Sequence, residues 1–136
     1  MVSAIAPNGS SNVPSRRARF PRSARLLRHA DFERVYKQGR RHFAAHMTVF
    51  YLRRQEGEGL RVGFTVGRVL GGAVERNRMK RRLREAVRRQ CPGLTAPVDV
   101  VINPKKSLLT ADFAGLMDEI SRAFEVIEKA LRKQNT

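Results

Sequence analysis

The chain has 136 residues, with 28 Lys or Arg against 12 Asp or Glu, a formal net charge of +16 and a pI near 11.6. This length predicts one domain with a core of its own, and a single Cys excludes a disulfide framework and a cysteine-rich zinc site. The excess of positive charge favours a polyanionic partner, nucleic acid first and an anionic membrane surface second. No run of about 18 apolar residues and no apolar signal segment is visible, so we expect a cytoplasmic protein without a membrane partner.

The positive charge is unevenly distributed along the chain. Residues 1–28 contain six Arg and no acid, whereas residues 110–136 contain five acids against four bases. Residues 1–19 are polar and turn-rich, which predicts a disordered basic arm before a folded domain at residues 20–136. The polyanion is therefore expected to meet the N-terminal arm and the middle of the chain.

Asp31–Gln38 is predicted to be a short helix. Phe32, Val35 and Tyr36 share one of its faces by their three-and-four spacing, and Gly39 follows as a stop. Residue type and spacing leave two alternatives open for Phe32 and Tyr36, which belong either to the core or to a binding surface.

Three strands are predicted from alternating or continuous apolar residues. Met47–Arg53 and Leu60–Val66 are separated by a Gly-rich turn at 56–59, which predicts an antiparallel hairpin. Val98–Ile102 is a short apolar run typical of a buried strand, and it ends at Asn103-Pro104.

Ala73–Arg89 is predicted to be an amphipathic helix with a basic outer face. Eight of the fourteen residues from Arg76 to Arg89 are Arg or Lys, and only Glu85 is acidic. On a helical wheel the residues within about 60° of Leu83 form the buried arc: Met79, Ala86, Val87 and Gln90. The rest of the circumference carries a strip of cations: Arg78, Lys80, Arg81, Arg82, Arg84, Arg88 and Arg89. Guanidinium forks can bind two phosphate oxygens each, so this strip predicts a nucleic-acid surface.

The last predicted helix runs from about Ala111 to Arg132. It carries a continuous apolar stripe over six turns: Phe113, Leu116, Met117, Ile120, Phe124, Ile127 and Leu131. Together the elements predict an α+β fold in which helices pack on one sheet.

No catalytic or metal-binding constellation is visible in the sequence. The acids form no pair suited to general acid–base work, and no Gly-rich phosphate loop is followed by Lys-Ser or Lys-Thr. His29, His42 and His46 lack a metal-binding spacing, and Cys91 is interpreted as a structural thiol. We therefore expect neither a catalytic residue nor a metal ligand in this chain.

Three segments, in order, carry a family resemblance. They are D-F-E-R-V-Y-K-Q-G at Asp31–Gly39, V-G-F-T-V-G-R-V-L-G-G-A-V-E-R-N-R-M-K-R-R-L-R-E-A at Val62–Ala86, and V-D-V-V-I-N-P-K at Val98–Lys105. They resemble the bacterial ribonuclease P protein component over about residues 20–134. The R-N-R-x-K-R core is far more specific than a generic basic run.

The resemblance implies a small two-layer α/β sandwich with element order αβββαβα. It implies a four-stranded sheet and a rare left-handed crossover, as in the second domain of ribosomal protein S5. The fourth strand would then lie within Gly39–His46. The implied function is that of the protein subunit of ribonuclease P, an endoribonuclease that removes the 5′ leader of precursor tRNA.

The resemblance also implies the partners and the residues that meet them. The catalytic centre would be RNA, with Mg²⁺ bound mainly by that RNA subunit, and no obligate protein partner is expected. Contacts to the catalytic RNA map onto Arg68, Arg76, Asn77, Arg78, Lys80, Arg81 and Arg84. The cleft for the single-stranded leader maps onto Phe32, Tyr36 and Phe50.

Two positions depart from the family pattern, and one alternative function stays open. Val69 and Gly72 stand where many members carry Lys and Asn, so Arg68 would make its contact without a neighbouring cation. The alternative is a non-catalytic RNA-binding module, such as a ribosomal protein or RNA chaperone. Composition alone does not separate it from an enzyme subunit.

Overall fold

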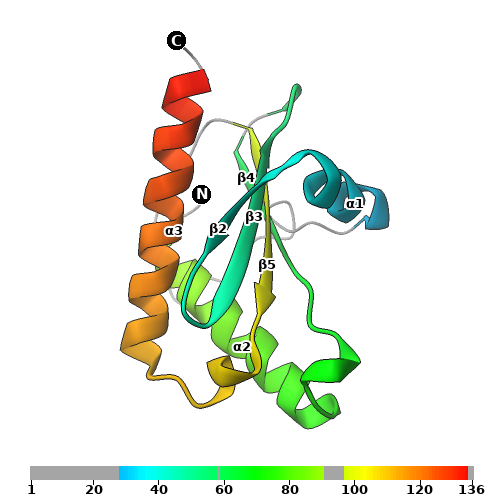
Figure 1. Ribbon diagram of the computed structural model, residues 1–136, viewed down its shortest axis with the longest axis vertical. Helices are drawn as coiled ribbons and strands as arrows, with labels where there is room; N and C mark the ends of the chain where they lie inside the picture. Colours follow the sequence, from blue (N-terminus) through cyan, green and yellow to red (C-terminus); the bar gives the residue numbers. More distant parts are fainter. Residues whose placement is uncertain (1–27, 58, 91–96, 135–136) are drawn as a thin grey trace, which may run out of the picture.

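The computed structural model describes residues 28–57, 59–90 and 97–134. The predicted arm at 1–19 and Cys91 lie outside the described residues. The helices and strands follow in the order α1 His29–Gln38, β2 Arg40–Phe43, β3 Met47–Arg53, β4 Leu60–Phe64, α2 Ala73–Gln90, β5 Val98–Pro104 and α3 Phe113–Gln134 (Figure 1). Short 3₁₀ turns occupy Arg68–Leu70 and Lys106–Leu109. The predicted order αβββαβα is confirmed, and β2 is the fourth strand expected within Gly39–His46.

The four strands form one mixed sheet in the order β2-β3-β5-β4. β3 pairs antiparallel with both β2 and β5, whereas β4 pairs parallel with β5. The predicted hairpin between β3 and β4 is therefore wrong, because β5 lies between them. The reason is burial: all but one residue of β5 is buried, so this strand takes an interior position where both of its edges are hydrogen-bonded.

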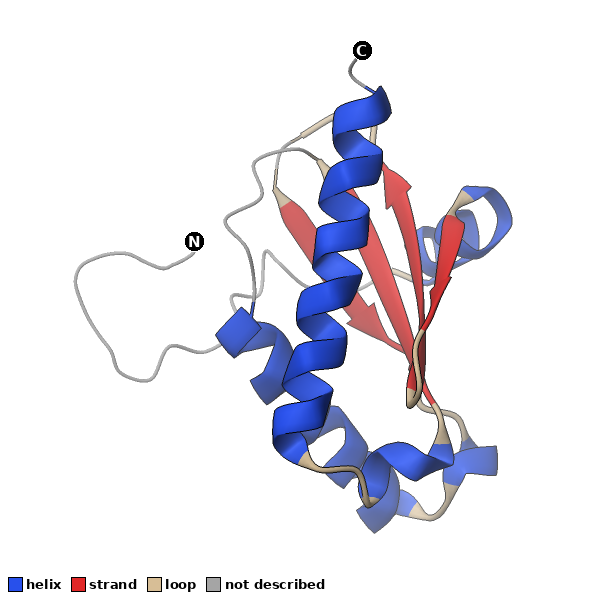
Figure 2. Ribbon diagram, turned by 60° about the vertical axis from the view of Figure 1, so that its left-hand side comes forward, coloured by secondary structure: helices blue, strands red, loops and turns tan. Residues whose placement is uncertain are grey.

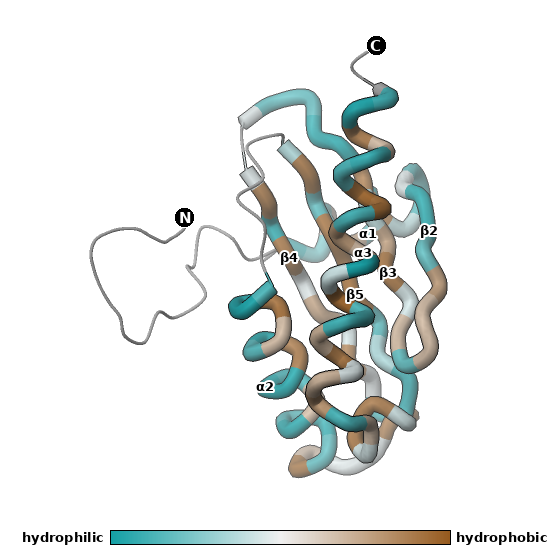
Figure 3. Tube along the Cα trace, turned by 90° about the vertical axis from the view of Figure 1, so that its left-hand side faces the viewer, coloured by the Kyte–Doolittle hydropathy of each residue, from teal (hydrophilic) through white to brown (hydrophobic). Residues whose placement is uncertain are grey.

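Most of the core lies between the sheet and the two long helices. α2 and α3 cover one face of the sheet, and α1 covers part of the other (Figures 1 and 2). The predicted inner residues of α2 are buried, namely Met79, Leu83, Ala86 and Val87. The α3 stripe is buried at Leu116, Ile120, Phe124, Ile127 and Leu131. Along both helices hydrophobic residues alternate with hydrophilic ones (Figure 3), as expected for elements with one buried face.

A second, smaller apolar cluster joins α1 to the opposite face of the sheet. Val35 and Val101 are fully buried there, and Phe32, Phe50 and Leu52 pack against them. α1 ends at Gly39, whose N–H donates to the Val35 carbonyl at 2.8 Å. A Cβ at this position would lie 2.5 Å from the Val35 oxygen, so only glycine allows the chain to turn so tightly from α1 into β2.

The β4–α2–β5 segment is a crossover between neighbouring parallel strands. It carries the basic helix of the sequence, and the left-handed sense implied for it stays a prediction. Within the described ranges, no helix combines the length and the apolar character needed to cross a lipid bilayer.

Candidate nucleic-acid interfaces

The basic helix α2 begins with a side-chain cap. The Gly72 carbonyl accepts the first helical hydrogen bond from the N–H of Arg76, and the Glu75 carboxylate accepts from the Gly72 N–H at 3.0 Å. This is the reciprocal half of a capping box, and it places an acid at the positive end of the helix dipole. The cap and the buried arc hold α2 rigid, so its outer side chains form a fixed surface.

Some cations of α2 are held by the protein itself. Arg82 donates to the Ala111 carbonyl, and Arg88 and Arg89 both pair with the Glu85 carboxylate. The guanidinium carbons of Arg82 and Arg89 also lie 5.9 and 5.6 Å from the Phe113 ring centroid. The hydrogen bond from Arg88, and then that from Arg89, hold the pKa of Glu85 below its ordinary value. The predicted strip is therefore too broad, since these three arginines stabilise the α2–α3 junction or the helix.

The remaining basic residues of the strip have no partner among the residues that the structure describes. None of the residues predicted to contact RNA makes an ion pair or side-chain hydrogen bond to any other residue that the structure describes: Arg68, Arg76, Asn77, Arg78, Lys80, Arg81 and Arg84. Arg76 and Lys80 are half-buried, and the other five are exposed. Arg68 lies in the 3₁₀ turn before α2, and the other six lie on α2 itself. The structure thus assembles a surface of uncompensated positive charge.

The three aromatics predicted for the leader cleft come together where α1 meets the sheet. The Tyr36 and Phe50 ring centroids lie 4.9 Å apart with an interplanar angle of 89°, an edge-to-face contact. Phe32 and Phe50 are half-buried against the smaller cluster, whereas Tyr36 is 37% exposed. Phe32 therefore packs in the smaller core cluster, whereas Tyr36 offers ring surface to solvent, and its role in binding stays a prediction.

Polar contacts fix the Tyr36 ring above the sheet. Its hydroxyl donates to the Asn103 side-chain oxygen at 2.9 Å and lies 2.6 Å from the Thr65 hydroxyl. The neighbouring Phe50 ring is approached by Arg41, whose guanidinium carbon lies 5.9 Å from the Phe50 ring centroid. A Tyr36 ring held by its hydroxyl is already ordered for stacking, which reduces the entropy lost on binding.

A buried ion network under α1 is a feature that the sequence reading missed. Asp99, fully buried in β5, receives two hydrogen bonds of 2.8 Å from Arg61 and one of 2.8 Å from Arg54. Arg61 also reaches the Asp31 carboxylate of α1 at 3.4 Å. The hydrogen bond to Asp99 raises the pKa of Arg61 above its ordinary value. Arg61 therefore ties α1 to β4 and β5, and it sets where Tyr36 lies over the sheet.

The acids of the described segments offer no metal centre. No group of three or more His, Cys, Asp or Glu among these residues is placed to hold a metal ion. Asp31 and Asp99 are neutralised by arginines, and Glu119 pairs with His46, whose Nε2 lies 3.6 Å from its carboxylate. These three carboxylates are therefore already engaged with cationic or imidazole side chains.

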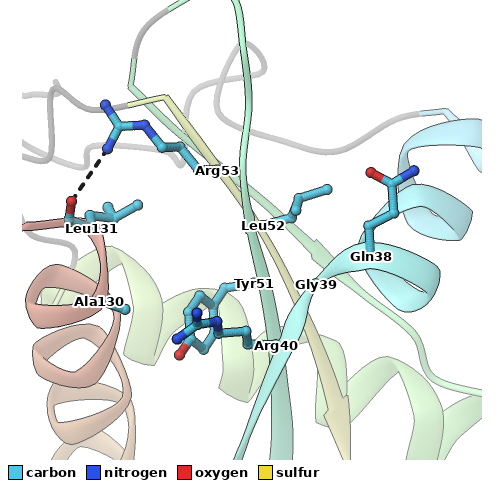
Figure 4. Close-up of a pocket in the computed structure, with 8 residues that line it drawn as sticks. All are labelled: Gln38, Gly39, Arg40, Tyr51, Leu52, Arg53, Ala130 and Leu131. Atoms are coloured by element: carbon cyan, nitrogen blue, oxygen red, sulfur yellow. Dashed lines mark hydrogen bonds between the residues drawn. The ribbon is translucent and has the colours of Figure 1, made fainter. Parts of the chain in front are cut away.

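A shallow hollow near the end of α3 lies apart from both surfaces. Its lining comes from the α1–β2 junction, β3 and α3: Gln38, Gly39, Arg40, Tyr51, Leu52, Arg53, Ala130 and Leu131 (Figure 4). Arg53 donates to the Leu131 carbonyl at 3.5 Å, which satisfies one of the last carbonyls of α3. None of the residues predicted to bind RNA lines this hollow.

The fold and the basic helix define a small basic α+β domain. Comparison with known proteins identifies the family to which this domain belongs. The family model for Ribonuclease P matches residues 20–128. The ribonuclease P protein component of Symbiobacterium thermophilum is 41% identical over 101 residues, covering 74% of this chain and 88% of the relative. That of Acidothermus cellulolyticus is 36% identical over 119 residues, covering 86% and 98%. The chain therefore belongs to the family of bacterial ribonuclease P protein components.

Solved structures agree with the fold. The ribonuclease P protein of Thermotoga maritima superposes with a TM-score of 0.62 at 27% identity, covering 72% of this chain and 96% of that one. The protein of Staphylococcus aureus gives a TM-score of 0.67 at 24% identity, covering 76% and 94%.

Proposed function

We propose that this chain is the protein subunit of a cytoplasmic ribonuclease P ribonucleoprotein, which removes the 5′ leader from precursor tRNA. In this proposal α2 binds the catalytic RNA. The surface where α1 meets the sheet, formed by Phe32, Tyr36 and Phe50 and called the groove below, binds the single-stranded leader. Family membership supports the assignment to ribonuclease P, and the two surfaces support the division of labour.

The free cations of α2 suit a folded RNA partner. Arg78, Arg81 and Arg84 are exposed and lack described partners, so binding phosphates does not break an existing ion pair. Each neutralised phosphate releases counterions, which makes the affinity strongly dependent on salt. Guanidinium forks bind phosphate oxygens in pairs, so a rigid row of them can hold the protein in one orientation.

The aromatic groove suits a single strand of variable sequence. Tyr36 and Phe50 present ring surface, and every base has a face that can stack on it. Stacking tolerates sequence differences, as an enzyme with many precursors requires. Stacking on these rings should depend less on salt than the phosphate contacts of α2.

The residues of this chain bind and orient RNA in the proposal, and catalysis belongs to the RNA subunit. Mg²⁺ held mainly by that RNA would stabilise charge at the scissile phosphate. The protein side chains described above have no step in the bond cleavage itself. Their contribution is to raise the affinity for leader-bearing substrates and to hold the leader in place.

The observation that carries the proposal is the row of cations on α2 that have no partner among the described residues, in a chain of this family. The test is leader cleavage by bacterial ribonuclease P RNA at near-physiological salt and Mg²⁺, with and without the protein. We expect the protein to increase the rate of cleavage. RNA binding without any gain in cleavage would contradict the proposal and favour the RNA-binding module.

A further inference from the structure

Phe43 is a large apolar side chain that the fold leaves in solvent. It is 68% exposed at the end of β2, one of the two edge strands of the described sheet. No ring or cation contact to Phe43 occurs within the described ranges, and its neighbour Arg41 is exposed as well. An exposed Phe beside the aromatic groove is a candidate for contact with a partner.

Strand register places Phe43 on the same face of the sheet as Phe50. Directly opposed residues of antiparallel strands share a face, and Arg41 pairs with Phe50 while Phe43 pairs with Thr48. Thr48 in turn pairs with Asn103, and Thr65 follows the last residue of β4. A row of residues therefore crosses all four strands, and we call it the sheet row: Phe43, Thr48, Asn103 and Thr65.

Helix α1 leaves the sheet row accessible. Val35 and Asp31 of α1 lie over Val101 and Arg61, further along the strands. Only the Tyr36 hydroxyl reaches the sheet row, through Asn103 and Thr65. Thr48 and Asn103 are half-buried, and Thr65 and Phe43 are exposed. The sheet row is thus a floor that runs from the Tyr36 ring to the β2 edge.

Cations flank Phe43 at that edge. The Arg41 side chain lies on the same face two residues earlier, with its guanidinium carbon 5.9 Å from the Phe50 ring centroid. The Lys105 ammonium donates to the carbonyl of Ala44, the residue after Phe43, at 3.4 Å. An aromatic face between two cations matches a nucleotide, whose base stacks while its flanking phosphates meet the charges.

We infer that Phe43 is an additional stacking platform for the single strand, and that the sheet row guides the strand between Tyr36 and the β2 edge. This inference rests on the proposed function and extends its groove. Three interstrand spacings of about 4.8 Å give the row a length of about 14 Å, enough for roughly four nucleotides at the 3.4 Å stacked rise. Phe43 therefore meets a different nucleotide from the one at Tyr36.

The test is an abasic scan of the leader with the reconstituted holoenzyme. Each leader position in turn loses its base, and the Kd of the precursor tRNA is measured with the wild type, Phe43→Ala and Tyr36→Ala. We expect Phe43→Ala to raise the Kd of the intact precursor about fivefold or more, with mature tRNA unaffected. We also expect one leader position at which removal of the base raises the Kd with the wild type and with Tyr36→Ala, but no longer does so with Phe43→Ala.

Two controls accompany the scan. Val126→Ala removes an exposed apolar side chain from α3, on the other side of the sheet, and should leave every Kd unchanged. Phe43→Tyr keeps a stacking ring and should restore the affinity. Because Phe43 is exposed, its truncation should leave the far-ultraviolet circular dichroism spectrum and unfolding midpoint unchanged.

The outcomes separate this inference from the proposed function. A wild-type abasic profile for Phe43→Ala, with a changed profile for Tyr36→Ala, would overturn the role of Phe43 and leave the proposed function standing. Unchanged profiles for both variants would remove the leader groove altogether. If the wild type sediments as a dimer and Phe43→Ala sediments as a monomer with unchanged RNA affinity, the β2 edge binds a second copy of the chain and the inference is overturned.

Discussion

In the proposed function, the outer face of α2 and the groove under α1 would bind RNA by different physical means. On α2, Arg78, Arg81 and Arg84 are exposed and have no partner among the described residues, so charge dominates there. In the groove the rings of Tyr36 and Phe50 dominate, and Arg54 and Arg61 below them are neutralised by a buried carboxylate. One arginine-rich chain thus leaves guanidinium groups unpaired within the described residues in one region and uses them as internal supports in the other.

The difference predicts distinct responses to salt and to mutation. Interactions on the α2 face should weaken steeply as salt rises, whereas stacking in the groove should change little. The groove also depends on the ion network around Asp99, in which the loss of one residue should disturb all the others. The cations of α2 should instead contribute as separate contacts. The following substitutions test this contrast, from the largest expected effect to the smallest.

Asp99→Ala should break the groove while leaving the free cations of α2 in place. It removes the shared partner of Arg54 and Arg61 and leaves buried positive charge uncompensated. We expect the free energy of unfolding in urea to fall by about 3–5 kcal/mol. The control is Asp118→Ala, an exposed α3 acid, for which a change within about 0.5 kcal/mol is expected. Equal effects of the two substitutions would contradict a supporting role for Asp99.

Tyr36→Ala should weaken binding of leader-bearing precursor tRNA by about 1–3 kcal/mol and spare mature tRNA, because one stacking platform is lost. Affinities of the holoenzyme for both RNAs measure this difference. Tyr36→Phe is the matched control, since it keeps the ring and loses only the hydroxyl contacts to Thr65 and Asn103. Equal weakening for precursor and mature tRNA in Tyr36→Ala would mean that the ring is structural.

Arg78→Ala and Arg81→Ala should each flatten the salt dependence of binding to the catalytic RNA. Each lost phosphate contact reduces the slope of log K against log salt by about 0.7–0.9. Arg88→Ala is the matched control on the same helix, because its guanidinium is held by Glu85. An unchanged slope in both test variants would remove these residues from the interface.

Glu85→Gln should have the smallest effect, about 0.5 kcal/mol at neutral pH, since its pairs with Arg88 and Arg89 are partly exposed. The pKa of Glu85 is lowered in the folded state, so its stabilisation is present above the unfolded pKa. It is lost as the pH falls through the folded pKa. Unfolding measured from neutral to acidic pH should therefore show the variant and the wild type converging in acid. A constant difference would contradict the pairing.

Local sequence patterns predicted most of the helices and strands, and they predicted which face of α2 is buried. The spacing of Met79, Leu83, Ala86 and Val87 identified the buried arc because a helix repeats every 3.6 residues. Strand order was wrong because adjacency in the chain favours a β3–β4 hairpin, and only tertiary burial places β5 between them. The family resemblance predicted β2, whose four residues carry little pattern of their own.

The sequence alone did not predict which partner each charged side chain has in the fold. Arg78 and Arg88 each follow a glutamate by three residues, and only the structure shows that Glu75 caps the helix whereas Glu85 pairs with Arg88. One usable signal was present: Asp99 interrupts an apolar run, and a buried acid requires a cation. Phe43 left no such signal, since its face and exposure follow from strand register.

Tethered hydroxyl-radical probing tests most directly that the two regions meet different RNAs. An iron chelate is attached to Val74→Cys on α2, to Lys37→Cys on α1 or to Glu125→Cys on α3, all exposed positions, with Cys91 replaced by Ser. In the holoenzyme bound to precursor tRNA, we predict cleavage of the catalytic RNA from position 74 and of the leader from position 37, with little from position 125. Cleavage of the same RNA segment from positions 74 and 37, or of neither RNA, would contradict the account.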